Sequence, residues 1–218
     1  IQYAEISEDA FRELLKLPLK DIRLESPMTE QRMKAFGDCD SLEELSLKCN
    51  KNHGDIWKSF RSPKNLRKLQ IFATPLSPDS LAPLTHHEKL EELTIDTNDW
   101  QSEPWEEIAK IPNLEYLSIG GSGLSGKGIG SLAKLTKLRT LRIEAPDFSE
   151  EGVRELLKCR QLEYIHAMDA PVSDELADEF LKMPNLHKLY FGLGLISKAS
   201  ASKISDEMER RRVAKGIK

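Results

Sequence analysis

The sequence of 218 residues contains few cysteines, few aromatic residues and no long apolar run. No stretch approaches the roughly 18 to 20 apolar residues of a membrane-spanning helix, and no signal-peptide-like segment opens the chain, so we expect no membrane insertion. The three cysteines form no metal-binding pair and are odd in number: Cys39, Cys49 and Cys159. We interpret them as small core residues in a reducing compartment, with a Cys39–Cys49 disulfide as the alternative. The compartment stays open, although unpaired cysteines and the lack of a glycosylation sequon favour the cytoplasm.

Positive charge is scarce outside one segment. The formal net charge is −4, and residues 198–218 carry seven Lys/Arg against three Asp/Glu, which leaves 25 basic and 33 acidic residues in the remainder. A surface of that sign is poorly suited to a phosphate backbone, so we expect no nucleic acid over the main body. We interpret the basic segment as a solvated terminal helix, with binding of nucleic acid or an acidic protein as the alternative.

One pattern repeats along most of the chain. Leu114-Glu-Tyr-Leu-Ser-Ile119 is one copy of Leu-x-x-Leu-x-Leu, in which apolar and polar residues alternate over the last four positions. Matching copies follow one another with a constant 24-residue period and begin at Leu42, Leu66, Leu90, Leu114, Leu138, Leu162 and Leu186. A further copy begins at Leu19, one position closer to its neighbour than the period requires. The alternation predicts a strand with one buried face. The fixed period predicts a solenoid of stacked units.

The second half of each unit is predicted to be a helix. In most copies it opens with an apolar residue followed by serine, whose hydroxyl can accept a hydrogen bond from a free N–H of the first turn. The candidate caps are Ser77, Ser125, Ser149, Ser173 and Ser197. Apolar residues three apart follow, such as Val153 and Leu156, and form one inward stripe. Trp57 and Trp105 lie at core helix positions, and Trp100 is expected to pack as well, with partial exposure as the alternative.

The two ends differ from the central units. Residues 1–16 align with residues 143–158, so the chain begins inside a unit. We expect residues upstream of Ile1, because the first unit of a stack needs a polar cap. The resulting division is a repeat domain of residues 1–197, which includes a partial repeat at 1–18, and a basic C-terminal capping helix or tail of residues 198–218.

The pattern resembles the leucine-rich-repeat family, whose units read L-x-x-L-x-L-x-x-N/C-x-L. The resemblance covers residues 1 to about 197, in the helix-bearing variety with a 24-residue period. It implies an α/β fold: a curved, right-handed solenoid, or horseshoe, with a parallel β-sheet on the concave face and α-helices on the convex face. The asparagine position departs from the family, because it holds Asn50, Thr74, Asn98, Ser122, Pro146, Ala170 and Gly194. The family uses that amide to bond the loop backbone, so we expect the C-terminal turns to be satisfied by water or backbone groups.

No motif for catalysis, metal binding or nucleotide binding fits the chain better than the repeat does. The segment Gly121-Ser-Gly-Leu-Ser-Gly-Lys-Gly128 approaches the phosphate-binding G-x-x-x-x-G-K-[ST], but Gly128 replaces the hydroxyl that binds Mg²⁺. The repeat register also explains Leu124 and Ser125, so we interpret the segment as a glycine-rich turn. His86-His87-Glu88 lacks the spacing of a metal site and is expected at the solvated surface. We therefore expect no enzyme activity, no cofactor and no metal.

The outward side chains of the predicted strands change character along the chain. Residues at the same outward position of successive strands form a column across the sheet. In one such column the charges of Glu44, Lys68 and Glu92 alternate in sign, so we expect an electrostatic ladder across neighbouring strands. Toward the C-terminal half the columns gather Tyr, Arg, His and Met, including types enriched in interface cores and hot spots. The candidate partner-binding residues are Tyr116, Ser118, Arg142, Glu144, Tyr164, His166, Met168, Lys188 and Tyr190. The alternative is that tyrosine is simply favoured in strands.

These features predict a non-catalytic module that binds a protein or peptide partner on the concave sheet face, as the family resemblance also implies. We expect a monomer, with no nucleic acid over the repeats, no membrane and no metal. The alternative is a targeting or sensor arm of a larger enzyme or receptor whose active domain lies upstream of residue 1. The start inside a unit favours that alternative, whereas catalysis by the chain itself has no residue constellation to carry it.

Overall fold

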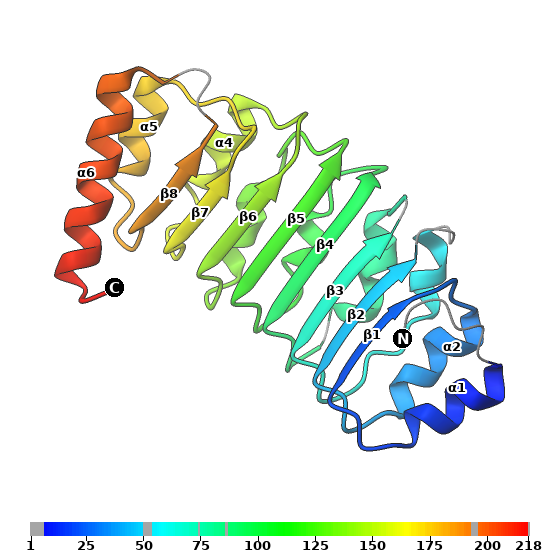
Figure 1. Cartoon of the computed structure of the whole chain (residues 1–218). Coiled ribbons are helices and arrows are strands. Elements are labelled where there is room, and N and C mark those ends of the chain that lie inside the picture. The colour runs from blue at the N-terminus through cyan, green and yellow to red at the C-terminus, as the bar shows by residue number, and fades with distance from the viewer. Residues whose placement is uncertain (1–6, 50–53, 74, 86, 193–195, 218) are drawn as a thin grey trace.

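The computed structural model describes residues 7–49, 54–73, 75–85, 87–192 and 196–217, except for the side chains of residues 54, 55 and 73. Within these ranges eight strands form one parallel sheet, and their order in space is their order in the sequence (Figure 1). The strands are β1 (Asp21–Glu25), β2 (Glu44–Cys49), β3 (Lys68–Ala73), β4 (Glu92–Asp99), β5 (Tyr116–Ser122), β6 (Thr140–Glu144), β7 (Tyr164–Ala167) and β8 (Lys188–Phe191). The predicted parallel solenoid is confirmed.

The 24-residue period sets the register of the sheet. Glu44 pairs with Lys68 and Lys68 with Glu92, so equivalent residues of successive units lie side by side. The register shifts between Asp96 and Asp99, where β4 pairs with β5. Within the predicted ladder, Lys68 Nζ lies 2.8 Å from Glu92 Oε2, which confirms that pair. The same register places the outward columns of the last four strands next to one another.

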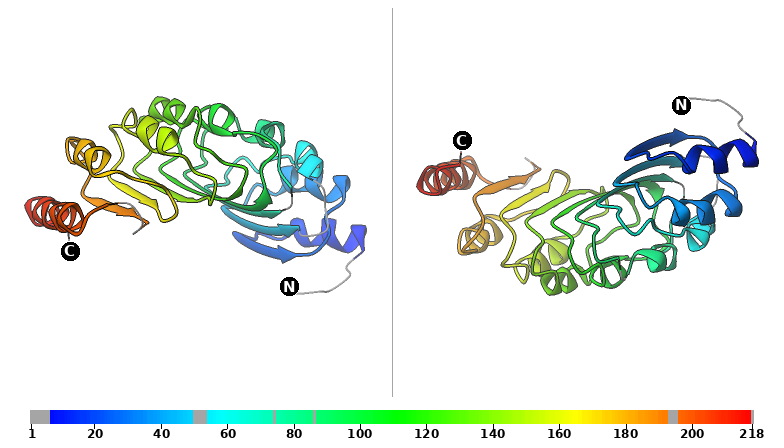
Figure 2. Two further views of the ribbon diagram at one scale, coloured as in Figure 1. Left: turned by 90° about the horizontal axis from the view of Figure 1, so that it is seen from above. Right: turned by 90° about the horizontal axis from the view of Figure 1, so that it is seen from below.

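The second half of each unit covers the face of the sheet opposite to the outward side chains, along the outside of a shallow arc, while the last helix lies at the end of the stack (Figure 2). These elements are α1 (Glu8–Leu15), α2 (Glu30–Ala35), η1 (Phe36–Asp38), η2 (Gly54–Ser59), η3 (Pro78–Leu84), α3 (Trp105–Ile108), η4 (Ile129–Lys134), α4 (Glu150–Leu156), α5 (Asp174–Phe180) and α6 (Lys198–Ala214). The convex side therefore mixes α-helices with the short 3₁₀-helices η1 to η4. Pro83 within η3 has no N–H to donate, and Gly128 and Gly130 at the start of η4 disfavour an α-helix.

Serine hydroxyls cap three of the five predicted helix starts. They accept hydrogen bonds from the N–H three residues later, and the three are Ser149, Ser173 and Ser197, at 3.1, 3.4 and 3.1 Å. The prediction is wrong for Ser77, whose hydroxyl lies 3.2 Å from that of Ser80 and makes no capping bond. Ser125 accepts a hydrogen bond from the Lys127 N–H at 3.3 Å and donates to Glu103 Oε1 at 2.6 Å, but it does not start the helix, because η4 begins at Ile129 with Gly128 as its N-cap. Both of these serines precede 3₁₀ segments, whose first turn presents its N–H groups differently.

One apolar core fills the space between the sheet and the convex elements. Trp57 and Trp105 are buried in it, as predicted. Trp100 is only 3% exposed and its Nε1 donates to the Gly120 carbonyl at 3.1 Å, so the alternative of partial exposure is wrong. All three cysteines are buried and free, which confirms their interpretation as core residues and rules out the alternative disulfide.

The asparagine position of the family pattern does not face the core at Asn98. That residue is exposed, and the preceding Thr97 is the buried one. The Ser122 hydroxyl, one unit later, donates to the Asn98 carbonyl at 2.6 Å. Near the C-terminal end the Ala170 N–H bonds the Ala167 carbonyl at 3.3 Å, so that turn is satisfied by backbone, as expected. Three further residues of this position lie outside the described residues: Asn50, Thr74 and Gly194.

Helix α6 packs against α5 and lies beside β8, the last strand (Figure 1). Its buried residues, Ile204 and Met208, are one turn apart. The Arg211 guanidinium donates to the carbonyls of three residues that follow α5, namely Leu181, Met183 and Leu186, the last two at 2.8 and 2.9 Å. At least one arginine of the basic segment therefore stabilises the fold. Of the helices within the described ranges, none is long and apolar enough to cross a bilayer.

Candidate functional site

The nine predicted site residues lie on or next to the last four strands. Tyr116 and Ser118 belong to β5, Arg142 and Glu144 to β6, Tyr164 and His166 to β7, and Lys188 and Tyr190 to β8, while Met168 follows β7 directly. The register aligns Tyr116, Thr140, Tyr164 and Lys188 in one row, and Ser118, Arg142, His166 and Tyr190 in the next. Neighbouring strands are about 4.8 Å apart, so the four strands span about 15 Å. Three of the four tyrosines of the chain share this small surface.

The centre of this surface is an aromatic cluster, which we define as Tyr164, His166, Tyr190 and Lys188. The Tyr190 ring lies edge-on to both other rings, with centroid distances of 6.0 Å to Tyr164 and 5.9 Å to His166. Lys188 Nζ lies 4.7 Å from the Tyr164 centroid and 5.7 Å from that of Tyr190. Edge-to-face and cation–π contacts each favour this arrangement by about 1 kcal/mol. The side chains are therefore ordered before any partner arrives, which lowers the entropy cost of binding.

Arg142 connects the aromatic cluster to β5. A hydrogen bond with the Tyr116 side chain raises the pKa of Arg142, against a smaller opposing effect of partial burial. Burial raises the pKa of Tyr164, so this phenol is neutral at neutral pH. The guanidinium thus keeps its full positive charge beside Tyr116 and Tyr164, and the charge of Glu144 raises the pKa of Arg142 further.

His166 is held as a neutral imidazole. Desolvation lowers its pKa, and the positive charge of Arg142 lowers it further, while Glu144 opposes the shift. Its Nδ1 is buried and has no hydrogen-bond partner among the described residues. A buried nitrogen without a partner lowers the stability of the folded protein.

Cations on the two halves of the sheet face differ in their partners. In the N-terminal half, Lys48 Nζ lies 2.8 Å from Glu25 Oε1, and Lys68 forms the pair with Glu92 described above. In the C-terminal half, no ion pair with another described residue includes Arg142 or Lys188; both contact tyrosines instead. The positive charge around the aromatic cluster is therefore not neutralised by contact with a carboxylate.

The other predicted site residues lie around this centre. Ser118 pairs with Arg142 in the register and is half-buried, and Glu144 is exposed at the end of β6. Met168 and Tyr190 are 49% and 48% exposed, more than the other described large apolar residues of the sheet face. The structure thus brings Tyr164, His166, Lys188 and Tyr190 into contact, links Arg142 to Tyr116, and leaves Ser118, Glu144 and Met168 at the margin.

The glycine-rich turn after β5 has no free cradle for a phosphate. Asp147 Oδ2 accepts from the Gly123 N–H at 2.8 Å, and Glu103 Oε1 from the Ser125 N–H at 2.7 Å. The two carboxylate oxygens of Glu155 accept from Gly128 and Gly130 at 3.2 and 3.3 Å. Carboxylates of neighbouring units therefore occupy the N–H groups and place negative charge where a phosphate would sit. This arrangement supports the prediction of an ordinary turn.

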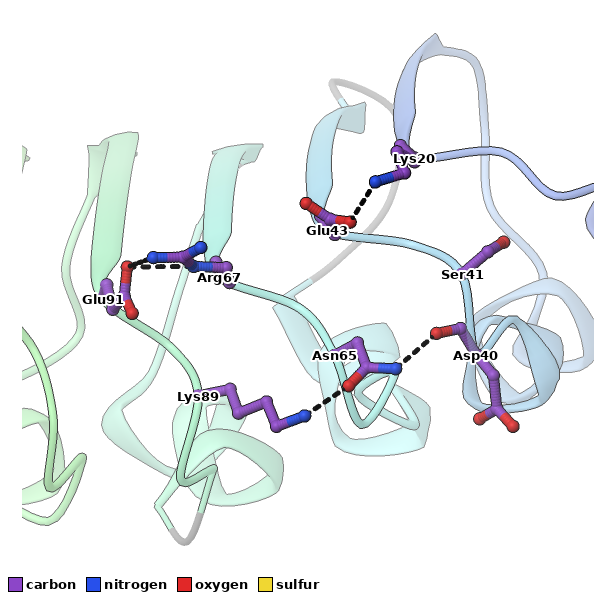
Figure 3. A pocket seen from close by; sticks show the side chains of 8 residues that line it. All are labelled: Lys20, Asp40, Ser41, Glu43, Asn65, Arg67, Lys89 and Glu91. Atoms are coloured by element: carbon purple, nitrogen blue, oxygen red, sulfur yellow. Dashed lines mark hydrogen bonds and ion pairs between the residues drawn. The ribbon is translucent and has the colours of Figure 1, made fainter.

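A charged groove lies where the chain enters the N-terminal strands (Figure 3). Its lining residues are Lys20, Asp40, Ser41, Glu43, Asn65, Arg67, Lys89 and Glu91. Lys20 Nζ lies 2.8 Å from Glu43 Oε1, and Arg67 Nη2 lies 2.6 Å from Glu91 Oε2. Because opposite charges pair within this groove, it offers little net charge to an ionic ligand.

A second hollow was not predicted, and we call it the edge groove. It lies between β8 and α6, has a volume of about 360 Å³, and is lined by His187, Lys188, Leu189, Tyr190, Phe191, Ile196, Ala201, Ile204, Ser205, Met208, Glu209 and Arg212. Lys188 and Tyr190 belong to both the edge groove and the aromatic cluster, so the two are continuous. The sequence signal for it is the pair Ile204 and Met208, four residues apart in an otherwise polar helix.

Metal ligands do not gather in the part of the chain that the structure describes, where no group of three His, Cys, Asp or Glu side chains could hold an ion. His87 is half-buried, with Nε2 2.7 Å from the Pro63 carbonyl, so it is less solvated than expected. Its neighbour His86 lies outside the described residues.

Comparison with known proteins agrees with this architecture. No family model matches the sequence, and neither does any curated protein. The structure is similar to that of internalin C2 from Listeria monocytogenes strain 4b F2365, with a TM-score of 0.53 and 20% identity over 86% of this chain and 74% of that chain. It also aligns with internalin F of the same strain, with a TM-score of 0.49 and 12% identity over 89% of this chain and 68% of that chain. The 24-residue period, the in-register parallel sheet and the similarity to internalin C2 together show that the chain has the leucine-rich-repeat fold, as its sequence pattern predicts.

Proposed function

We propose that this chain is a non-catalytic interaction module that binds a protein or peptide partner on the concave sheet face, over β5 to β8. The observation that supports it is the aromatic cluster, joined by Arg142 and Tyr116 on one preordered surface. Tyrosine and arginine are enriched among residues that dominate binding energies, and truncation of such a residue commonly costs about 2 kcal/mol or more.

The chemistry of the face favours a polypeptide over other ligands. The repeats carry an excess of acidic residues, which disfavours nucleic acid. The N–H groups of the glycine-rich turn donate to carboxylates of the chain itself, which disfavours a nucleotide there. In the N-terminal half, paired charges on the same face are suited to orienting a partner during its approach rather than to holding it.

The test is a quantitative pull-down from lysate of the source cells with three forms of the protein. These are the native chain, a cluster variant with Arg142→Glu, Tyr164→Ala and His166→Ala, and a control with Lys137→Glu, an exposed residue between η4 and β6. All three must first show the same melting temperature. We expect a protein that is captured by the native chain and the control and is lost from the cluster variant.

Two results would contradict the proposal. Equal capture by all three forms would place the binding site elsewhere, for example on the convex side or on α6. No capture by any form would argue against a module that binds on its own and would favour the alternative of an arm in a larger enzyme or receptor.

A further inference from the structure

The aromatic cluster and the edge groove form one continuous surface with two different chemistries. We infer that its ligand is an extended acidic peptide segment that carries a large apolar side chain three or four residues from its key carboxylate. This inference rests on the proposed function and narrows the class of partner.

The two cations, Arg142 and Lys188, favour a carboxylate in the ligand. Arg142 and Lys188 flank the Tyr164 ring from β6 and β8, and neither forms an ion pair with another described residue. The Arg142 guanidinium has several N–H donors, and the neutral His166 beside it adds no competing positive charge. A ligand carboxylate placed here gains charge-assisted hydrogen bonds without breaking an existing ion pair. Removal of one such cation is expected to weaken binding about tenfold.

The apolar walls of the edge groove favour an apolar side chain in the ligand. Leu189 and Phe191 form one wall and Ile204 and Met208 the other, and all four are core residues whose edges reach the hollow. Lys188 and Tyr190 border the hollow on the side of the aromatic cluster. Burial of a leucine or phenylalanine side chain in such a site is expected to raise affinity about ten- to a hundredfold.

The spacing follows from the sheet. Arg142 on β6 and Lys188 on β8 are two strands apart, about 10 Å, and the edge groove lies just beyond β8. A carboxylate over the cations is thus roughly 10 to 15 Å from an apolar side chain in the groove. An extended chain advances about 3.3 Å per residue, so three or four residues separate the two groups.

The test is selection of short random peptides on the native protein, followed by affinity measurement with four single variants and with the double variant that carries Tyr164→Ala and His166→Ala. Ser205→Trp fills the edge groove from an exposed position of α6, and Ser202→Trp is its matched control, exposed on the same helix outside the groove. Lys188→Glu reverses one cation of the site, and Lys137→Glu is the matched charge control. Each variant must melt like the native protein.

We expect enriched peptides with Asp or Glu three or four residues from a large apolar residue. Their affinity should fall at least tenfold with Ser205→Trp and with Lys188→Glu, and stay within about twofold for both controls. Replacement of the peptide carboxylate by its amide should cost about tenfold on the native protein and little on Lys188→Glu.

The outcomes separate this inference from the proposed function. Dependence on the aromatic cluster is judged with the variant carrying Tyr164→Ala and His166→Ala. Suppose that peptides lose affinity for this variant, but lack the acidic–apolar pattern or bind Ser205→Trp as tightly as the native protein. That result would overturn this inference and leave the proposed function standing. Peptides that bind native protein and that cluster variant equally, or no enrichment at all, would overturn both.

Discussion

Two glycines in the turn after β5 should respond very differently to alanine. Gly121 has φ 128°, and a Cβ there would lie 2.2 Å from the Thr97 carbonyl oxygen of the preceding unit. Gly128 has φ 86°, but a Cβ there would meet no atom within 4 Å. Gly121→Ala therefore adds a clash to an unfavourable backbone conformation, whereas Gly128→Ala adds only the conformational cost.

The magnitudes follow from these contacts. A conformation that side chains rarely adopt costs about 1 to 3 kcal/mol. At Gly121 the end of β5 must also move by about 1 Å to relieve the clash, which strains the hydrogen bond from the Trp100 N–H to the Ser122 carbonyl, 3.0 Å long and worth about 1 kcal/mol. We expect Gly121→Ala to lower the free energy of unfolding by about 2 to 4 kcal/mol. At Gly128 the loss is about 1 kcal/mol, partly offset by the lower entropy of the unfolded alanine chain.

Thermal unfolding followed by circular dichroism measures this difference. In a chain of this size each kcal/mol lowers the melting temperature by about 2 to 4 °C. Gly121→Ala should therefore melt about 4 to 16 °C below the native protein, and Gly128→Ala within about 4 °C of it. Equal shifts for the two variants would refute the close approach of β5 to the Thr97 carbonyl.

Three further predictions concern single side chains. Arg211→Ala removes the donor to three backbone carbonyls and should lower the free energy of unfolding by about 2 kcal/mol in urea titrations. Replacement of the exposed Arg210 by alanine should lower it by under about 0.5 kcal/mol. Equal effects would contradict the stabilising role of the hydrogen bonds from Arg211. Burial raises the pKa of the Cys159 thiol to about 12, so iodoacetamide at pH 8 should label it only after unfolding, and rapid labelling of native protein would disprove its burial. The pKa of His166 is lowered by desolvation and by Arg142, so its NMR titration midpoint should fall below 6.5. Because the unfolded state then binds more protons, stability contributed by the neutral His166 is lost as pH falls below about 6.5. His166→Gln should therefore make the free energy of unfolding less dependent on pH in this range. An unchanged pH dependence would contradict the lowered pKa of His166.

The repeat spacing was sufficient to predict the strands and their register. Tyr116, Tyr164 and Lys188 stand in one row because they occupy the same position of different units. Burial of Trp57 and Trp105 also followed from position within the unit. Features that depend on a single unit's pattern were therefore visible in the sequence.

Features that depend on side chains particular to one pair of neighbouring elements, rather than on the repeated pattern, were not. No helix starts at Ser125, although its hydroxyl accepts from the Lys127 N–H, and Glu103 of the preceding unit accepts from the Ser125 hydroxyl and N–H. The edge groove exists only because α6 lies beside β8, and no repeat position encodes that placement. The sequence likewise predicted which residues share the concave face, but not that Lys188 lies over the Tyr164 ring rather than beside a carboxylate.

The central claim is that a partner protein binds over the aromatic cluster, and photo-crosslinking tests it most directly. Met168 is exposed on this face, and Lys137 is exposed between η4 and β6. Each is replaced in turn by p-benzoylphenylalanine, and the two proteins are irradiated in lysate of the source cells. The account predicts a discrete crosslinked partner from position 168, lost when Tyr164→Ala and His166→Ala are added, and none from position 137. Crosslinking from 137 and not from 168 would contradict it.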